Sequence, residues 1–542
     1  MHTSTPRRAS WLRLLFAFVL VALVAAACGD DSDTAGGDTG DGGGSEAPST
    51  TEDPGTPVAG GEATILLYSE TGHLDPVRFT GSGGADGMRA FALYGALVTY
   101  DGAANEVKPV LAESLEPNED FTVWTLKLKP GITFSDGTPF NAEAVKINWE
   151  VRQDVSKRSP SLTYLLSVTD LTVVDETTLQ ITLTAPNANF DKAVSKGGLN
   201  YIASAKALQD GTDLTSTAIG AGPFLLDSWT RDDRMVLSKN PNWKGSDGPY
   251  LDKLIFRVVG DENQRIDTFT TGQAQGFYTA TPASVKNATE SVKGAYYTSI
   301  DVTTGQTYVF NNSKPPFDDI RIRKAFVMAV NWQALSDVVF GEGSQWLDTF
   351  TIPGTPWHSE NAKLPAYDPD EAQRLIDEYV AEKGGPVKIH MYAFQQSLDQ
   401  ARADFILAAL GQLKNLEVTI EVNDSPTNIS KVLAGDYMVS SWGFPVVATD
   451  PGVFNAAYSA AFTNYSKYKN EKVDALIDQG RTIRDPDESA KIYQQVFDIL
   501  AEDLPFYPYV KTTNGFVLSP DLKGGQVYED GILRFDLLWL NK

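Results

Sequence analysis

The sequence predicts a mixed α/β fold in a large globular body that follows a polar N-terminal segment. Two observations support this prediction. Strand-like alternation and helix-like spacing of apolar residues follow one another along the chain, most clearly between Val387 and Val422. In addition, roughly 480 residues follow Gly60, which exceeds the size at which a single core keeps growing. The body is therefore expected to contain two or three domains.

The first element in chain order is an export signal. Basic residues precede an uncharged apolar run, Leu14–Val24, and three alanines separate this run from Cys28. The run is shorter than the roughly 20 residues that a membrane-spanning helix needs. We therefore predict that residues 1–27 form a signal peptide. The pair Arg7 and Arg8 leaves the twin-arginine export route open beside the general one.

The second element, residues 28–60, is predicted to be a disordered tether. It is rich in Gly, Ser, Thr, Asp and Pro, and it contains no aromatic residue, Lys or Arg. Such a composition cannot bury enough apolar surface to offset the entropy lost on ordering. A flexible chain of this length has a reach on the order of 30 Å, which would hold a globular body near its point of attachment.

Composition excludes several function classes for the body. The formal net charge of −25 argues against binding to nucleic acid and against an electrostatically held membrane surface. Cys28 is the only cysteine, so the body has neither thiol catalysis nor thiolate metal sites. His73, His358 and His390 are far apart in sequence, and the metalloprotease, serine-hydrolase and phosphate-loop motifs are absent. We expect no enzymatic activity, no metal and no cofactor.

A meander of antiparallel strands is predicted in the first half of the body. Apolar and polar residues alternate over 124–128, and turn residues follow at Pro130-Gly131 and Asp136-Gly137, on either side of Ile132 and Phe134. Apolar spacing also predicts helices over 142–150, 321–334, 370–382, 473–483 and 488–502.

A strand–helix–strand unit with parallel strands is predicted in the second half. Apolar residues alternate over 387–391 and again over 418–422, and helical spacing fills residues 401–413 between them. Parallel strands need such a crossover, which is nearly always right-handed.

Short sequence blocks, taken in order, resemble one known family. The sharpest is Phe-Ser-Asp-Gly-Thr-Pro-Phe at 134–140. Others occur at 73–76, 93–98, 109–114, 220–224, 240–243, 311–325 and 468–474. Together they are similar to the peptide, opine and nickel class of extracytoplasmic solute-binding proteins of ABC importers. Within them, we interpret Gly220 and Gly222 as residues that supply backbone freedom where a new segment begins.

This resemblance implies a periplasmic-binding-protein-like fold of type II, cluster C: a two-lobed clam with an extra third domain. Lobe I would combine 61–87, 193–305 and 515–542, the extra domain would be 88–192, and lobe II would be 306–514. A ligand would bind in the cleft between the lobes and favour the closed form. A membrane permease with its ATPase subunits would then receive the ligand from a monomeric binding protein.

The resemblance also implies how the chain is held at the membrane. Small residues before Cys28 are similar to the lipobox of bacterial lipoproteins, although Ala25 replaces the usual leucine. We expect Cys28 to be lipid-modified and to anchor the body at the outer face of the cytoplasmic membrane. A ligand-sensing receptor with the same fold is the alternative function.

The identity of the ligand is the open part of the prediction. In peptide-binding members, a segment resembling Gly-Trp-x-x-Asp-Tyr-x-Asp-Pro lines the cleft, and its first Asp pairs with the α-ammonium group of the ligand. The corresponding segment here is 443–451, in which Val447 replaces that Asp and Phe444 replaces the Trp. A desolvated ammonium group without a counter-ion costs several kcal/mol, so free-amine peptides are not the expected ligand unless Asp450 or Glu70 takes over this role.

The cleft residues implied by the resemblance and by their neighbours are aromatic or neutral, and such a lining suits a sugar, a modified peptide or another neutral metabolite. They are Phe79, Thr80, Ser161, Tyr164, Tyr308, Ser441, Trp442, Phe444, Val447 and Phe454. Two of them, Trp442 and Phe454, have an alternative interpretation as core residues. His73 could contact the ligand or a metal, although a single loop histidine more often does neither.

Overall fold

Three β-sheets of four or more strands organise the described part of the chain. We name each part by its sheet: lobe I has seven strands, the extra domain has four, and lobe II has six. Residues 52–542 group into one unit by their contacts. The computed structural model describes residues 55–81, 86–101, 105–279, 282–298, 305–341, 345–395, 397–444, 450, 452–461, 463–511, 515–528 and 531–541.

The sheet of lobe I has a parallel centre and antiparallel flanks. Strand β1 pairs in parallel with β10 on one side and with β11 on the other. The order is β12-β19-β11-β1-β10-β9-β8, so β19, from near the end of the chain, lies between β11 and β12 from its middle. The strands are β1 (Glu62–Leu67), β8 (Phe224–Thr230), β9 (Arg234–Lys239), β10 (Lys253–Val258), β11 (Gly276–Thr279), β12 (Ala295–Thr298) and β19 (Gly515–Leu518).

Helices and short strands complete lobe I. The helices are α1 (Gly87–Tyr94), α5 (Ala205–Gln209), α6 (Glu262–Thr270) and α7 (Pro282–Val292), with 3-10 turns η1 (Pro76–Arg78), η3 (Gly197–Asn200) and η5 (Phe535–Leu537). Two short antiparallel pairs of strands are β20 (Leu522–Lys523) with β23 (Trp539–Leu540), and β21 (Val527–Tyr528) with β22 (Ile532–Leu533).

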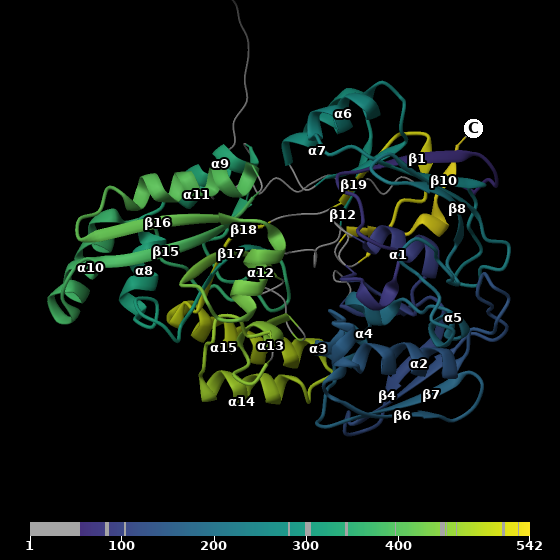
Figure 1. The fold of residues 1–542 in the computed structure, drawn as a ribbon, viewed down its shortest axis with the longest axis horizontal. Helices are drawn as coiled ribbons and strands as arrows, with labels where there is room; N and C mark the ends of the chain where they lie inside the picture. Colours follow the sequence, from purple (N-terminus) through teal and green to yellow (C-terminus); the bar gives the residue numbers. More distant parts are fainter. Residues whose placement is uncertain are drawn as a thin grey trace, which may run out of the picture. The chain divides into compact units, whose positions relative to one another are not determined.

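The extra domain is an antiparallel sheet in the order β4-β5-β7-β6, with helix α2 across one face (Figure 1). The predicted strand over 124–128 is confirmed as β5, but Ile132 and Phe134 lie in a loop closed by the bridge Thr133–Pro139. The elements are β2 (Val98–Asp101), β3 (Glu106–Pro109), β4 (Ala112–Pro117), β5 (Val123–Leu128), α2 (Ala142–Gln153), η2 (Val155–Lys157), α3 (Leu162–Leu165), β6 (Val168–Val173), β7 (Thr178–Leu183) and α4 (Phe190–Ser195).

Gly220 and Gly222 are needed for close packing and not for backbone freedom. Neither has a positive φ. A Cβ atom at Gly220 would lie 2.3 Å from the carbonyl oxygen of Leu93, and one at Gly222 would lie 2.4 Å from the carbonyl carbon of the same residue. The interpretation from sequence was therefore wrong in its reason: these glycines let the chain pass directly against helix α1.

The sheet of lobe II contains the predicted strand–helix–strand unit, which is confirmed. Strands β15 and β16 pair in parallel from Val387 and Leu416 onward, and α11 joins them. The sheet order is β14-β18-β13-β17-β15-β16. The strands are β13 (Gly305–Phe310), β14 (Gln345–Trp346), β15 (Val387–Phe394), β16 (Leu416–Asn423), β17 (Val439–Phe444) and β18 (Phe506–Lys511).

Capping residues set the ends of the lobe II helices. Asp368 accepts a hydrogen bond from the amide of Glu371 at the start of α10, and Gly384 ends that helix with a φ of +79°. Helices α14 and α15 run side by side in Figure 1. The helices are α8 (Ile320–Met328), α9 (Trp332–Phe340), α10 (Pro369–Lys383), α11 (Ser397–Leu410), α12 (Ser425–Leu433), α13 (Gly452–Ala457), α14 (Glu471–Gly480) and α15 (Pro486–Asp503).

Four of the five predicted helices are confirmed as α2, α10, α14 and α15, and the fifth is divided. The expected single helix over 321–334 is two helices, α8 and α9. Asn331 between them is extended, and its side chain accepts a hydrogen bond from the amide of Ala334. Asparagine competes for backbone hydrogen bonds and is therefore a stronger capping residue than a helix-interior residue.

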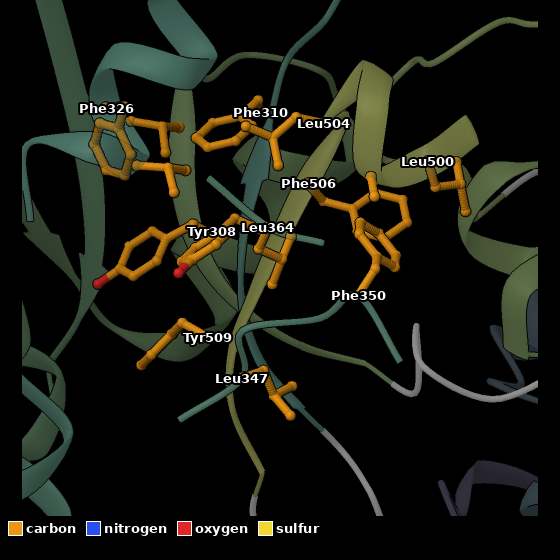
Figure 2. Close-up of a cluster of buried hydrophobic side chains, with 14 of the residues drawn as sticks. Tyr308, Phe310, Phe326, Leu347, Phe350, Leu364, Leu500, Leu504, Phe506 and Tyr509 are labelled. Carbon is orange, nitrogen blue, oxygen red and sulfur yellow. The ribbon is translucent and has the colours of Figure 1, made fainter. Parts of the chain in front are cut away.

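The core of lobe II is aromatic on one face of its sheet. Figure 2 shows Tyr308 beside Tyr509 and Phe326, and the ring centroid of Tyr308 lies 5.5 Å and 5.8 Å from theirs. On the other face, Val309 packs with Val432 of α12. Both faces of this sheet are therefore buried, which fixes the positions of the residues that β13 and β17 carry.

Candidate ligand-binding site

The loop that follows η1 is held in place by one buried carboxylate. Asp86 accepts hydrogen bonds from the backbone amides of Thr80 (2.9 Å) and Gly81 (2.8 Å), and from the hydroxyl of Thr80 (3.0 Å). Burial raises the pKa of Asp86, while these three hydrogen bonds oppose the rise because they stabilise the ionised form. The Thr80 hydroxyl is thus committed to positioning the loop.

Three predicted site residues from two segments, the loop after η1 and the start of α3, meet around Gly197. A Cβ atom at Gly197 would lie 3.2 Å from the ring of Tyr164, 3.5 Å from the carbonyl oxygen of Thr80 and 3.6 Å from Oγ of Ser161. The Ser161 hydroxyl also accepts a hydrogen bond from the amide of Gly198 at 2.9 Å. The structure therefore brings Thr80, Ser161 and Tyr164 together in one wall, which we call the Gly197 wall.

Phe79 supports this wall from inside the core of lobe I. Its side chain is fully buried, its ring stacks on His73 with centroids 5.8 Å apart, and it meets the edges of Tyr94 and Tyr201. Burial lowers the pKa of His73, and the nearby guanidinium of Arg78 lowers it further. His73 is thus neutral at physiological pH and packs against an aromatic ring.

Three of the predicted residues of lobe II lie on two neighbouring strands, with side chains on both faces of the sheet. Tyr308 of β13 pairs directly with Ser441 of β17, and both side chains are buried. The next residue, Trp442, points to the other face, where its ring meets Tyr465 with centroids 5.3 Å apart. Phe444 ends β17, but its side chain lies outside the described residues.

Val447 also lies outside the described residues, as does the rest of 445–449. Cys28 and the whole of 1–54 share that status, so the structure does not address the predicted anchor, signal peptide or tether.

Phe454 lies beneath a charged side chain of its own lobe. The guanidinium of Arg481 lies 4.1 Å from the ring centroid of Phe454, and Tyr458 stacks on the same ring with centroids 4.6 Å apart. Arg481 also lies 3.6 Å from the carboxylate of Asp450. Burial raises the pKa of Asp450, and Arg481 opposes this rise. Phe454 is thus part of a packed group that holds Asp450.

The two acidic alternatives for binding an amine both have partners within the protein. Asp450 is buried with Arg481 as an ion-pair partner at 3.6 Å, and its carboxylate accepts no hydrogen bond within the described residues. Glu70 accepts hydrogen bonds from the amides of Thr71 (2.8 Å) and Asp232 (2.9 Å), and it lies 3.2 Å from the guanidinium of Arg89. A ligand ammonium would have to compete with these partners.

One hydrogen bond joins the Gly197 wall to the Phe454 group. The Thr163 hydroxyl donates to Oδ1 of Asn455 at 3.4 Å. Thr163 precedes Tyr164 in α3, and Asn455 follows Phe454 in α13. The extra domain and lobe II therefore contact each other beside two of the predicted ligand-binding residues.

The sequence interpretation missed a polar group at the carboxyl ends of parallel strands of lobe I. Thr279 at the end of β11 donates to Glu262 at 2.8 Å, and Tyr68 directly after β1 stacks near Tyr278 with centroids 5.5 Å apart. Ligands of open α/β sheets bind at this edge. The available signal was the apolar end of β1, Ile65 to Leu67, which places Tyr68 at that edge.

A hollow of about 420 Å³ lies next to this polar group, at the end of β10 and the start of α6. Small-molecule sites commonly have volumes of this order. A Cβ atom on Gly260 in this hollow would lie 3.7 Å from the carbonyl oxygen of Tyr68, so the two features are adjacent. The hollow is lined by Arg257, Val258, Val259, Gly260, Gln264, Asp267 and Thr268.

Within the described residues, no helix is both long and apolar enough to cross a bilayer. The same residues include no group of three or more His, Cys, Asp or Glu side chains that could hold a metal ion.

Comparisons with known proteins agree on one family. The family "Bacterial extracellular solute-binding proteins, family 5 Middle" matches residues 106–466. Among curated proteins, the glutathione-binding protein GsiB of Escherichia coli (strain K12) is 27% identical over 454 residues, which cover 79% of this chain and 86% of GsiB.

Solved structures share the fold over nearly their whole length. The periplasmic binding protein DppA of Helicobacter pylori, in complex with the peptide STSA, is similar with a TM-score of 0.74, 22% identity, and coverage of 90% of this chain and 99% of DppA. AgaA from A. tumefaciens R10, in complex with agropinic acid, has a TM-score of 0.75, 22% identity, and coverage of 89% and 99%. These likenesses confirm the predicted type II binding-protein fold.

Proposed function

Because this chain belongs to family 5 of the bacterial extracellular solute-binding proteins, we propose that it captures a small solute between its lobes and delivers it to the permease of an ABC importer. Members of this family are binding components of transporters and not enzymes. The observation that carries the proposal is the Gly197 wall, where Thr80 meets Ser161 and Tyr164 of the α3 segment beside a contact with lobe II.

The wall offers hydrogen-bonding groups and an aromatic face without a formal charge. Tyr164 supplies a half-buried ring, Ser161 supplies a hydroxyl that is buried at the amide of Gly198, and Trp442 and Phe454 are further aromatic candidates from lobe II. Such a set favours a ligand with ring or apolar faces and amide or hydroxyl groups. The complete set of proposed ligand-binding residues from both lobes is Phe79, Thr80, Ser161, Tyr164, Tyr308, Ser441, Trp442, Phe444, Val447 and Phe454.

We propose a peptide-like metabolite whose binding does not depend on a free α-amino group. Val447 stands where peptide binders of the family place the amine-pairing Asp. Asp450 and Glu70, the acids that could replace it, are paired with Arg481 and Arg89. The curated relative GsiB is named for glutathione, and AgaA was solved with agropinic acid, so ligands other than simple peptides occur among similar proteins.

Calorimetry with two ligand libraries tests this proposal. A mixed di- to pentapeptide library and its N-acetylated counterpart should bind with similar affinity. Acetylation removes the charge of the α-amino group, and in the proposed site no carboxylate pairs with that charge. Val447→Asp should then favour the free-amine library by roughly tenfold or more, as a charge-assisted hydrogen bond does. Val422→Asp, at a half-exposed position of β16, is the control. Tight binding by the natural protein that is lost on acetylation would refute the proposal.

Native mass spectrometry of the freshly purified protein would identify retained cargo directly. A bound mass of a simple free-amine peptide would contradict the proposed ligand class, and a bound metabolite without a free α-amine would support it.

We also propose that Cys28 carries a lipid and holds the protein at the outer face of the membrane. The support is the sequence around Cys28, in which small residues follow an apolar run. Radioactive palmitate supplied to growing cells should label the natural protein and not Cys28→Ser. Equal labelling of both proteins would disprove the anchor.

A further inference from the structure

A short segment of the extra domain contacts the turn between α14 and α15 of lobe II. The amide of Ala188 donates to the carbonyl oxygen of Arg481 at 2.6 Å. Nη1 of Arg484 donates to the carbonyl oxygen of Ala188 at 2.7 Å. Both backbone polar groups of Ala188, a fully buried residue, are therefore paired with lobe II.

An ion pair and an aromatic ring reinforce this contact. Nη2 of Arg484 lies 2.8 Å from the carboxylate of Asp191, whose side chain is only 3% exposed. The guanidinium of Arg484 also lies 5.3 Å from the ring centroid of Trp124. Because the indole of Trp124 donates to the carbonyl oxygen of Asn187 at 3.1 Å, the ring belongs to the same structural group as the segment that Arg484 binds.

The extra domain is held to lobe I by separate, buried contacts. Arg152 of α2 donates to the carbonyl oxygens of Pro76 (3.0 Å) and Tyr201 (2.7 Å). Ala221 and Trp243 of lobe I also pack within the hydrophobic core of the extra domain. These buried contacts make the extra domain and lobe I a single packed body.

No chain segment connects the extra domain directly with lobe II. The chain passes between the lobes after β12 and before β13, and again after β18 and before β19. Both crossings join lobe I to lobe II. Ala188 and Arg484 are 296 positions apart in the sequence, so their contact depends on how the two lobes are brought together and not on chain continuity.

We propose that Ala188 and Asp191 with Arg481 and Arg484 form a closure latch: contacts that exist when lobe II is closed against the extra domain and break when the lobes open. This inference rests on the proposed function, in which ligand binding and closure are coupled. A ligand gains affinity only to the extent that the closed form is favoured. Arg484 is therefore a positioning residue that raises affinity without touching the ligand.

Hydrogen exchange at the Ala188 amide tests the latch in the ligand-free protein. The neighbouring amides of Asn187 and Asn189 bond within the extra domain, to Phe121 and to the Asn187 side chain. Of these three amides, only that of Ala188 bonds to lobe II, so its exchange rate reports specifically on the contact between the extra domain and lobe II. We expect slow exchange in the natural protein, and exchange roughly ten- to hundredfold faster in Arg484→Ala, because a charge-assisted hydrogen bond and an ion pair are lost.

Arg374→Ala is the matched control. Arg374 lies in α10 of lobe II and pairs with Glu371 and Glu378 of the same helix, so its removal breaks ion pairs without breaking a contact between domains. Exchange at Ala188 should not change in this variant. Fast exchange in the natural protein, or slow exchange that Arg484→Ala leaves unaltered, would overturn the latch.

A distance measurement separates the latch from the binding function. Cys28 is the only native cysteine, so in a Cys28→Ser background spin labels can be attached to Val174→Cys in the extra domain and Lys491→Cys in α15, both exposed positions. Without added ligand, Arg484→Ala should shift the label distances to larger values than in Arg374→Ala. Identical distributions would contradict the latch, whereas a shift without binding of either peptide library would contradict the proposed ligand alone.

Discussion

Gly197 is the residue on which the candidate site depends most directly. Its φ of +69° is a conformation that residues with a Cβ atom rarely adopt, and the space that a Cβ would enter is lined by Tyr164, Thr80 and Ser161. We expect Gly197→Ala to lower the free energy of unfolding by about 1 kcal/mol and to weaken ligand binding, because the Tyr164 ring must move. Urea unfolding and calorimetry measure the two effects.

Gly211 provides the control for this substitution. It has the same φ of +69°, but no atom lies within 4 Å of the position of its Cβ. Gly211→Ala should therefore cost a similar free energy of unfolding while leaving ligand affinity unchanged. If both variants bind as the natural protein does, the Gly197 wall does not contact the ligand.

Lys192 gives the protein a measurable pH dependence. Burial lowers its pKa to about 8, although its ammonium group donates to Asn105 at 2.7 Å and the carboxylate of Asp191 opposes the shift. In the unfolded chain its pKa is about 10.4. The unfolded chain therefore binds more protons between these two values, and the stability of the natural protein rises with pH across this window.

The substitution Lys192→Met isolates this effect. At pH 7 the natural protein bears the cost of burying a charge, and at pH 10 it does not. We expect the free energy of unfolding of the variant, relative to the natural protein, to fall by on the order of 2 kcal/mol from pH 7 to pH 10. Urea unfolding at several pH values measures this difference, and a constant difference would show that Lys192 is not desolvated.

At the scale of elements, the break between α8 and α9 shows the effect of one cap. Asn331 is exposed, and its side chain makes a 3.0 Å hydrogen bond with the amide of Ala334. We expect Asn331→Ala to reduce the free energy of unfolding by about 1 kcal/mol and Asn331→Asp to have little effect, because aspartate caps equally well. Chemical denaturation of both variants provides the measurement. Equal losses in both would mean that the cap does not stabilise the break.

The sequence predicts a strand or helix correctly where the apolar pattern that identifies it lies within that one element. Val387, Ile389 and Met391 alternate within one strand, and the helices over 142–150 and 370–382 have clear apolar faces, so these elements are confirmed. The faces of β13 and β17 could not be predicted in this way. Alternation shows that Ser441 and Trp442 point in opposite directions, but both faces of the sheet are buried, so the sequence does not show which side chain faces a ligand.

At the scale of the whole molecule, the contacts that matter join residues far apart in sequence. The pairing of Arg484 with Ala188 and the meeting of Tyr164 with Gly197 have no local signature, because each depends on how separate sheets pack. The predicted domain boundaries stay predictions for the same reason.

Arg152 is the strongest test of which parts move together. Its side chain is fully buried, burial lowers its pKa to about 10, and it donates to Asn148 and to the carbonyl oxygens of Pro76 and Tyr201 in lobe I. Arg152→Lys keeps the charge but lacks the planar fork that serves these acceptors together. We expect a loss of about 3 kcal/mol in the free energy of unfolding.

The same substitution at Arg374, which is exposed on α10, should change that free energy by less than about 0.5 kcal/mol. Arg152→Lys should also make the extra domain more sensitive to limited proteolysis under native conditions, since the domain would no longer be held to η1 of lobe I. Because the latch requires the extra domain to move as one body with lobe I, Arg152→Lys should additionally speed exchange at the Ala188 amide. Unchanged stability and proteolysis would mean that the extra domain is held to lobe I by apolar packing alone.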